Sequence, residues 1–541
     1  MATEKVTFKK NISTFSLLMT GVTAIIGSGW LLGTQKIAQN TGPAGIFSWI
    51  IGAGIIILVA LFFLEIGTHY PSSGGIGFYS HITHGRFCGF ITSWVNWLSI
   101  VAVPAIEAQG VVQYLSNISA SFNFLYTPDN QLLSFYGLLF AGGLLILFML
   151  INYWSVQLFI KFNNFFTVLK IAIPLLTIAA LVYNGLHMEN LGLSSMHSFA
   201  PYGWDAVLSS AIAGGVIMSF NGFQSPLTFS EEIKSPKRML PKAVIGSIFI
   251  ALLIYLLLQI TFEGSLSHQA LTNGWNHINY RSPYIALLMF ANFHLMVIVV
   301  YFGAVISPAA SGTAFLASSS RIMYSMANQE HLPAFIKYLH PKYQNPRNSL
   351  MVCTGVGLCL IFLFQGWNDM VEIISILHVF SYIPAPVIAL ANRRDERKNP
   401  SQQTHNSDSK RKQFKLPMGN LLGPCVLFVL SILLYYPTWP HDLEMLIFII
   451  PGLAFYCYYE VKQKRTKDFK SNLIAASWLL FYLISITLIN YCGNPHMQND
   501  LISEKTSFIL LALLSIVTVI YGVKVANFKG KEEFYSVRYH R

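Results

Sequence analysis

The sequence predicts an all-α membrane protein with about fourteen transmembrane helices. Of its 541 residues, 54% are hydrophobic and 11% are charged, and the mean hydropathy is +0.52. Soluble globular chains carry roughly a quarter of charged residues, so ordinary soluble domains are excluded. Runs of about 20 apolar residues, the length of helix that crosses the hydrocarbon core of a bilayer, recur almost to the C-terminus.

The apolar runs define the predicted spans and divide the chain into two groups of helices. The predicted spans are residues 14–36, 44–68, 90–115, 132–152, 158–183, 206–230, 240–262, 284–316, 349–366, 370–391, 419–437, 441–460, 472–491 and 505–525. A polar stretch after the tenth span predicts a flexible linker. We therefore expect a ten-span core in residues 1–395, a linker in 396–416, four additional spans in 417–526 and a tail in 527–541.

The distribution of basic residues predicts the orientation of the chain. All but four of the 35 lysines and arginines fall on one side of the predicted spans, and the exceptions are Lys36, Lys170, Arg281 and Lys505. Short loops rich in Lys and Arg stay in the cytoplasm, so we expect both termini to be cytoplasmic in a cell-membrane protein. Because topology explains the net charge of +12, no nucleic-acid partner is expected.

Two of the spans contain residues that interrupt a helix. Gly27, Ser28 and Gly29 lie in the middle of the first span, and Gly222 and Pro226 lie within the sixth. If five spans form a unit, the second unit starts from the opposite face of the membrane, and spans one and six are antiparallel equivalents. The ten-span core then consists of inverted repeats at about 14–183 and 206–391, and paired broken helices in such repeats indicate the binding site of a secondary transporter.

The peptide groups freed by these interruptions predict the chemistry of the ligand. In hydrocarbon every N–H and C=O needs a partner, so an unwound segment must line a cavity or be buried in protein. The amides of Ser28 and Gly29 open the second half of helix one and suit a carboxylate. Carbonyls near Ile25, Met218 and Asn221 suit an ammonium group. Glycines in membrane helices often serve packing alone, but two matched interruptions favour a site for the zwitterionic head of an amino acid.

Four motifs resemble those of a known family. They are "IIGSGWLLGTQKIAQNTGPAG" (25–45), "LEIGTHYPSSGGIGFY" (64–79), "SFNGFQSPLTFSEEIKSPKRMLPKAV" (219–244) and "SRIMYSMANQEHLP" (320–333). In this order they resemble the signatures of the amino acid-polyamine-organocation (APC) superfamily. Their residues are most similar to those of the branch of bacterial aspartate-proton symporters. The resemblance implies the LeuT-like fold of five plus five inverted repeats, with discontinuous helices 1 and 6.

The resemblance also implies a set of substrate-binding residues. Carried onto this chain, the set is Ile25, Gly27, Ser28, Gly29, Met218, Phe220, Asn221 and Gln224. Phe220 would be an aromatic lid over the substrate, although an ordinary core phenylalanine is an equal alternative. Many relatives carry Glu where this chain has Gln224. Glutamine cannot titrate, so a proton-sensing role at this position is not expected here.

Two ionisable residues within the spans are candidates for proton coupling. Lys170 lies about 12 residues into the fifth span, roughly 18 Å from its start, which is too deep for easy snorkelling to the headgroups. Proton-coupled relatives carry a lysine on helix five, so the resemblance agrees with a coupling role, and a structural lysine bonded to carbonyls is the alternative. Glu107, in the outer half of span three, could carry a second proton, select a charged substrate or bond to neighbouring polar groups.

These features predict a proton-coupled importer of amino acids. The alternatives are an amino acid exchanger that moves no net proton and a receptor that binds amino acids without transporting them. The sequence contains no HExxH, G-x-S-x-G or P-loop pattern, so an enzyme is not expected. The six cysteines show no metal-ligand spacing, and neither a metal nor another cofactor is expected. The expected partners are the amino acid, protons and the lipid bilayer.

Overall fold

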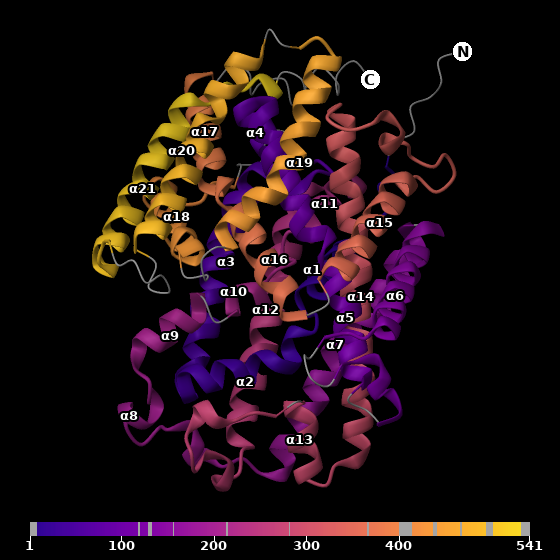
Figure 1. Cartoon of the computed structure of the whole chain (residues 1–541), viewed down its shortest axis with the longest axis vertical. Coiled ribbons are helices and arrows are strands. Elements are labelled where there is room, and N and C mark those ends of the chain that lie inside the picture. The colour runs from indigo at the N-terminus through magenta and orange to yellow at the C-terminus, as the bar shows by residue number, and fades with distance from the viewer. Residues whose placement is uncertain are drawn as a thin grey trace.

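The computed structural model is helical throughout the residues that it describes (Figure 1). These are residues 8–116, 120–127, 132–154, 156–212, 215–280, 282–364, 367–399, 414–435, 441–465, 468–493 and 501–531. They form α-helices and short 3-10 turns, with two isolated β-bridges. Most of the predicted linker and of the predicted tail lies outside these residues.

The first part of the chain supplies the helices that surround the two interruptions. They are α1 (Thr14–Ile25), α2 (Gly29–Thr41), α3 (Gly45–Gly67), α4 (Gly75–Val101), α5 (Val103–Ser116), α6 (Phe135–Trp154), α7 (Val156–Asn184), α8 (Met196–Phe199), α9 (Gly203–Ile212), α10 (Val216–Ser219), α11 (Ser225–Thr228) and α12 (Pro236–Gly264). We call the upper end of the molecule in Figure 1, above the labels of α17 and α4, the terminal end.

The second part completes this core and adds a group of four helices. The helices are α13 (Pro283–Phe290), α14 (His294–Asn328), α15 (Arg347–Leu363), α16 (Trp367–Tyr382), α17 (Pro384–Lys398), α18 (Gly419–Tyr435), α19 (His441–Lys462), α20 (Phe469–Gly493) and α21 (Glu504–Val525). Of the last four, orange to yellow in Figure 1, α18, α20 and α21 lie together at the upper left, and α19 runs beside α4 and α16. They pack against α4, α16 and α17.

Nine helical segments of the described residues are long and apolar enough to cross a membrane, with mean hydropathies from 1.5 to 2.7. This number is smaller than the fourteen predicted spans because some predicted spans are divided between two shorter helices and others are merged into one long segment. The first predicted span is split between α1 and α2, and α2 runs through one 3-10 turn into α3, so that Gly29–Gly67 forms a single segment. The shorter helices α1, α15 and α18 are also apolar. The chain is a multi-pass helical membrane protein.

Both predicted interruptions are present as breaks in the helices. Helix α1 ends at Ile25 and α2 begins at Gly29, so the first apolar run is non-helical where Gly27 lies. In the sixth run, α10 ends at Ser219 and α11 begins at Ser225. Between them Gly222 has φ +106°. Glycine adopts such a conformation without the steric cost that a Cβ brings, which accounts for the residue at this point.

The third predicted span begins differently from the expectation. Helix α4 contains a sharp bend at Gly85, which has φ +75°. A Cβ at Gly77 would lie 2.5 Å from the Cα of Ser93, and the Thr92 hydroxyl donates to the Gly77 carbonyl at 3.1 Å. The first half of α4 therefore folds back against the second half. Sequence patterns gave no sign of this hairpin because its first half, which contains His81, reads as a polar loop.

Hydrogen bonds at the terminal end fasten α21 and the residues that follow it to the core. Arg394 on α17 donates to the Val523 carbonyl at the end of α21, at 2.6 Å. Lys531 pairs with Asp395 at 2.6 Å. The buried His84 ring on α4 bonds to the Gly522 carbonyl at 3.0 Å. The additional helices are thus joined to the core by specific polar contacts as well as by apolar packing.

A buried ion pair closes the terminal end of the core. Arg321 on α14 donates to Glu232, beside α11, at 2.5 Å, and the two side chains are 4% and 2% exposed. The guanidinium also lies 4.1 Å from the centre of the Phe229 ring, which stacks on Phe159 of α7. The backbone carbonyl of Glu232 accepts from the amide of Ile12, just before α1. This pair holds together the segments that precede α1 and follow α11.

We expect the Arg321→Ala variant to be destabilised, because it leaves the Glu232 carboxylate buried without its partner, which typically costs about 3–5 kcal/mol. The double variant Arg321→Met, Glu232→Leu should recover most of this loss, since no uncompensated charge remains. Thermal unfolding of the purified protein checks both. A double variant that is no more stable than Arg321→Ala would show that the lost packing, and not the unpaired charge, causes the defect.

Candidate functional site

The two helix breaks are in direct contact with each other. A Cβ at Gly222 would lie 2.6 Å from the carbonyl carbon of Ala24, so the backbone of the second break packs against the end of α1. On the other side of the first break, a Cβ at Gly29 would lie 3.8 Å from the Ser219 hydroxyl oxygen, at the end of α10. The structure therefore brings together peptide groups that are almost 200 residues apart in sequence.

The carbonyls at the end of α1 bond to side chains of three neighbouring helices. Lys170 on α7 donates to the Thr23 carbonyl at 2.7 Å. Ser311 on α14 donates to the Ala24 carbonyl at 3.4 Å, and Tyr255 on α12 donates to the Ile25 carbonyl at 3.2 Å. Because the helix ends here, side-chain donors take the place of helical amides at these carbonyls, and the Ile25 carbonyl also accepts from the Gly27 amide at 3.1 Å.

The next two carbonyls share a single donor. The Ser307 hydroxyl of α14 lies 3.1 Å from the Ile26 carbonyl oxygen and 2.9 Å from the Gly27 carbonyl oxygen. Five successive carbonyls, from Thr23 to Gly27, thus have donors from α7, α12 and α14. The unwound segment is held in place by hydrogen bonds that do not depend on a bound molecule.

A carboxylate of the protein itself occupies the amide end of the first break. Glu107, on α5, faces the amide and the hydroxyl of Ser28 and the hydroxyl of Ser311, and its charge interacts with that of Lys170. Both ionisable side chains are buried, with 5% of Glu107 and 1% of Lys170 exposed. A Cβ at Gly27 would overlap the Glu107 carboxylate, so glycine is required for this close approach. The position that the sequence predicts for the carboxylate of a ligand therefore accommodates a carboxylate of the protein.

The Tyr255 hydroxyl contacts a backbone carbonyl of the second break as well as one of the first. Tyr255, whose hydroxyl bonds to the Ile25 carbonyl, also lies 3.1 Å from the Ser219 carbonyl oxygen. It therefore bridges the carbonyl ends of α1 and α10. The Met218 carbonyl accepts from the backbone amide of Asn221 at 3.0 Å, and its role toward a substrate ammonium group stays a prediction. The Ser219 carbonyl, one residue later, shares the Tyr255 hydroxyl with the Ile25 carbonyl.

Phe220 is completely buried in an aromatic cluster beside the breaks. Its ring centre lies 5.5 Å from that of Tyr255 and 6.1 Å from that of Trp49 on α3. The Trp49 indole donates to Gln259 of α12 at 2.9 Å. This packing places Phe220 next to the two carbonyl ends that Tyr255 bridges, where a movable ring would cover a bound molecule.

The remaining predicted residues, Asn221 and Gln224, bond to each other at 3.0 Å within the second break. They face His378 and Tyr382 of α16. Sequence reasoning did not find Tyr255, Ser307 or His378. Single polar or aromatic residues within an apolar run carry no periodic signal, and only their position opposite a break distinguishes them.

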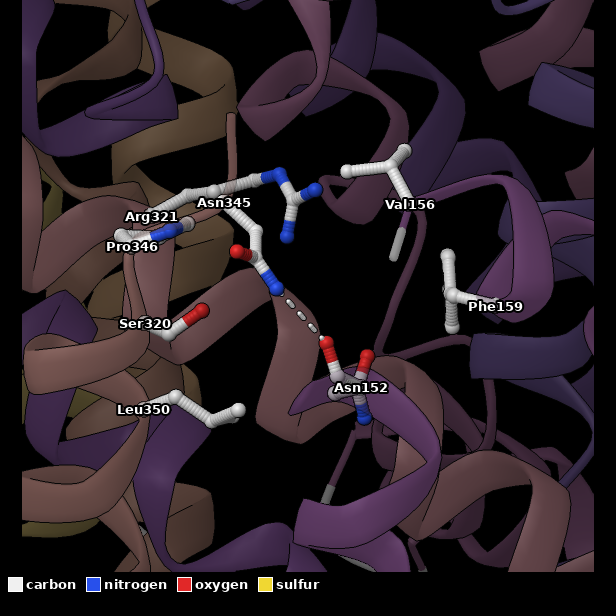
Figure 2. A pocket seen from close by; sticks show the side chains of 8 residues that line it. All are labelled: Asn152, Val156, Phe159, Ser320, Arg321, Asn345, Pro346 and Leu350. Atoms are coloured by element: carbon white, nitrogen blue, oxygen red, sulfur yellow. Dashed lines mark hydrogen bonds between the residues drawn. The ribbon is translucent and has the colours of Figure 1, made fainter. Parts of the chain in front are cut away.

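A small hollow lies near the terminal end, away from the two breaks (Figure 2). Its lining residues are Asn152, Val156, Phe159, Ser320, Arg321, Asn345, Pro346 and Leu350. Figure 2 shows Asn345 bonded to the backbone of Asn152, at 3.1 Å. None of the predicted substrate or coupling residues lines this hollow, which lies beside the buried Arg321 pair.

A multi-pass helical protein in which two broken helices meet beside a buried lysine and carboxylate has the features of a secondary transporter. Comparison with known proteins agrees with this class: the chain belongs to the amino acid permease family, whose model matches residues 12–456. The match ends within α19, so α20 and α21 lie beyond it. The protein therefore belongs to a family of amino acid transporters.

Curated relatives extend over nearly the whole chain. The glutamate/serine transporter AimA of Bacillus subtilis is 37% identical over 95% of this chain and 94% of its own length. The aspartate-proton symporter of the same organism is 28% identical over 94% of this chain and 95% of its own length. The mouse Asc-type amino acid transporter 1 is 25% identical over 70% of each chain. The similarity covers the additional helices in the two bacterial relatives.

Proposed function

We propose that this protein imports amino acids across the cell membrane by proton symport, with alternating access to the two sides. The observation that carries the proposal is the junction of the two helix breaks, where peptide groups bonded to side chains of other helices lie beside the buried Lys170 and Glu107. The family membership supports transport of amino acids, and the buried ionisable pair supports coupling to protons.

The proposed architecture is the LeuT-like inverted repeat. Residues 1–395 form the ten-span transport core, 417–526 add four spans, and the chain crosses the membrane fourteen times in total. Both termini then lie in the cytoplasm, in accord with the basic loops at the terminal end. The direct contact between Gly222 and Ala24 supports this arrangement, because paired breaks meet at the centre of such a repeat.

The amino acid binds by replacing two groups of the protein. Its carboxylate takes the place of the Glu107 carboxylate at the Ser28 and Gly29 amides, which stand at the positive end of α2. Its ammonium takes the place of the Tyr255 hydroxyl at the carbonyls of Ile25 and Ser219. The protein groups now bond to these peptide groups, so the site can stay closed without substrate.

Lys170 is the proposed coupling group. As an ammonium it donates to the Thr23 carbonyl and ties α7 to the end of α1. As a neutral amine it loses the charge that strengthens this bond, so the first half of helix one is released. A proton taken up from outside therefore favours the closed junction with substrate, and its loss on the cytoplasmic side opens the junction. Glu107, displaced from Ser28, keeps its attraction to the Lys170 ammonium.

The first substrates to test follow from the relatives. Glutamate, serine and aspartate appear in the names of the two bacterial relatives. All three share the α-carboxylate and α-ammonium that the breaks suit, and they differ only in side chain. We propose one of them as the substrate of this protein.

Uptake into liposomes tests the proposed function. Purified protein is reconstituted into vesicles without internal amino acid, and labelled glutamate, serine or aspartate is added under an acidic exterior. Accumulation that is abolished by a protonophore is the expected result. Accumulation that requires internal amino acid and ignores the pH gradient would indicate an exchanger. Saturable binding without flux would indicate a receptor, and either outcome would contradict proton symport.

A further inference from the structure

We propose that His378, on α16, is a positioning residue for substrate recognition, which acts on the second helix break through the side chain of Asn221. The proposal rests on the proposed function, because it assigns the residue that sets the shape of the same binding site. His378 is fully buried and belongs to none of the motifs that point to that site.

The protonation of the His378 ring follows from its two neighbours. The Nδ1 atom lies 3.0 Å from the carbonyl oxygen of Ile374, one helical turn earlier. A carbonyl can only accept, so Nδ1 carries the hydrogen and Nε2 is left as an acceptor. The Asn221 Nδ2 atom lies 2.8 Å from Nε2 and 3.2 Å from Nδ1, and because Nδ1 carries the hydrogen, only Nε2 can accept from it. A neutral ring in one tautomer thus fixes which way the Asn221 amide points.

The side-chain amide of Asn221 is linked through Gln224 to the backbone of the break, so its orientation determines the direction of the next hydrogen bonds. Its Oδ1 atom accepts from Gln224 Nε2 at 3.0 Å, and Gln224 Oε1 accepts from the Gly222 amide at 3.1 Å. The bonds from Gly222 through Gln224, Asn221 and His378 to the Ile374 carbonyl therefore all run in one direction. Reversing the Asn221 amide would set its NH₂ group against that of Gln224 and its oxygen against the bare His378 Nε2.

Tyr382 reinforces the same orientation from the next turn of α16. Its hydroxyl lies 3.0 Å from Asn221 Oδ1 and 3.3 Å from Gln224 Oε1, and its one hydrogen is shared between these two oxygens. Hydrogen bonds aligned head to tail strengthen one another in a site shielded from water. The chain of bonds fixes the amide plane at Gly222, which in turn touches the Ala24 carbonyl group of the first break.

The groups that act on the imidazole are therefore neutral. They are the Ile374 carbonyl, the Asn221 amide and, at 6.4 Å between ring centres, the phenol of Tyr382. Among the described residues of the helices packed on α16, none contributes a charge to the environment of His378. The second break is thus held by a neutral network, in contrast to the ionisable Lys170 and Glu107 at the first break. His378 positions substrate-binding groups and carries no transported proton.

Two substitutions of matched polarity test this assignment. In His378→Gln the side-chain oxygen reaches the place of Nε2 and can accept from Asn221, whereas in His378→Asn the shorter side chain reaches only the place of Nδ1. We expect His378→Asn to raise the KM for uptake about tenfold, the effect of one lost hydrogen bond, with little change in the maximal rate. His378→Gln should keep the KM within about threefold of the wild type.

The control is His84→Gln, which alters another fully buried histidine that bonds to a carbonyl, at the junction with the last four helices. Its KM should equal that of the wild type. Uptake of labelled glutamate, serine or aspartate is measured, whichever the wild type transports. Equal KM values for the two His378 variants, whether normal or raised, would overturn the proposal. Absence of uptake by the wild type would instead refute the proposed function. In that case binding replaces uptake as the readout, and the thermal shift that each amino acid produces is compared between the wild type and the same variants.

Discussion

Replacement of Gly222 with alanine is expected to abolish amino acid uptake while the protein still inserts and folds. The new Cβ would lie 2.6 Å from the Ala24 carbonyl carbon, a distance that non-bonded atoms do not reach, and φ of +106° is a conformation that alanine rarely adopts. Local strain of this kind costs about 1–3 kcal/mol, and the overlap adds to it. The second break must then move away from the first, which separates the Ser219 and Ile25 carbonyls that a substrate ammonium would join.

Two other glycines provide matched controls for this result. Gly215 also has a positive φ, +90°, but a Cβ there would meet no atom within 4 Å, so Gly215→Ala tests backbone strain without overlap. Gly54, inside α3, is equally open and has no strain, so Gly54→Ala should behave as the wild type. Uptake of labelled substrate and the amount of folded protein are measured for all three variants. Normal uptake by Gly222→Ala would show that the two breaks do not touch as described.

The second large effect is expected for Lys170. Lys170→Ala removes the ammonium that bonds to the Thr23 carbonyl and leaves the buried Glu107 without the nearby cation. We expect the variant to lose accumulation driven by a pH gradient, because the group that binds and releases the proton is gone. Exchange of labelled for unlabelled amino acid at equal pH should persist at a reduced rate, since the peptide groups of the breaks remain.

Lys170→Arg and Lys161→Ala separate the parts of this argument. Arginine keeps the positive charge but does not release its proton in a protein, so Lys170→Arg should also fail to accumulate substrate. Lys161, on the same helix, is exposed, and its replacement by alanine should leave proton-driven uptake unchanged. Both variants are assayed in liposomes beside Lys170→Ala. Wild-type accumulation by Lys170→Ala would exclude the residue from proton coupling.

Features encoded by local sequence were predictable. Glycines and a proline inside apolar runs marked the breaks near Gly27 and Gly222. Glycine lowers the stability of a helix whatever the fold, so these positions can be recognised from the sequence alone. The depth of Lys170 within its run predicted that the side chain would be buried. Membership of the amino acid permease family followed from four motifs in order. These inferences needed only residue types and spacing.

Features that depend on contacts between distant segments were not predictable. The meeting of Glu107 with Ser28 joins α5 to the start of α2, and no pattern in either segment records the other. Tyr255 could not be told from an ordinary aromatic residue of an apolar helix, although it bridges both breaks. The sharing of the Tyr255 hydroxyl by the Ser219 and Ile25 carbonyls depends on the turn after α10, which hydrophobic periodicity does not describe.

The central claim is that an amino acid binds between the two breaks by taking the places of the Glu107 carboxylate and the Tyr255 hydroxyl. A density map of the purified protein with its transported amino acid tests this most directly. We predict ligand density within about 3 Å of the Ser28 amide and of the Ile25 and Ser219 carbonyls, with both side chains displaced. A map in which Glu107 still faces Ser28 and Tyr255 still bridges the carbonyls, with the amino acid bound elsewhere, would contradict the account.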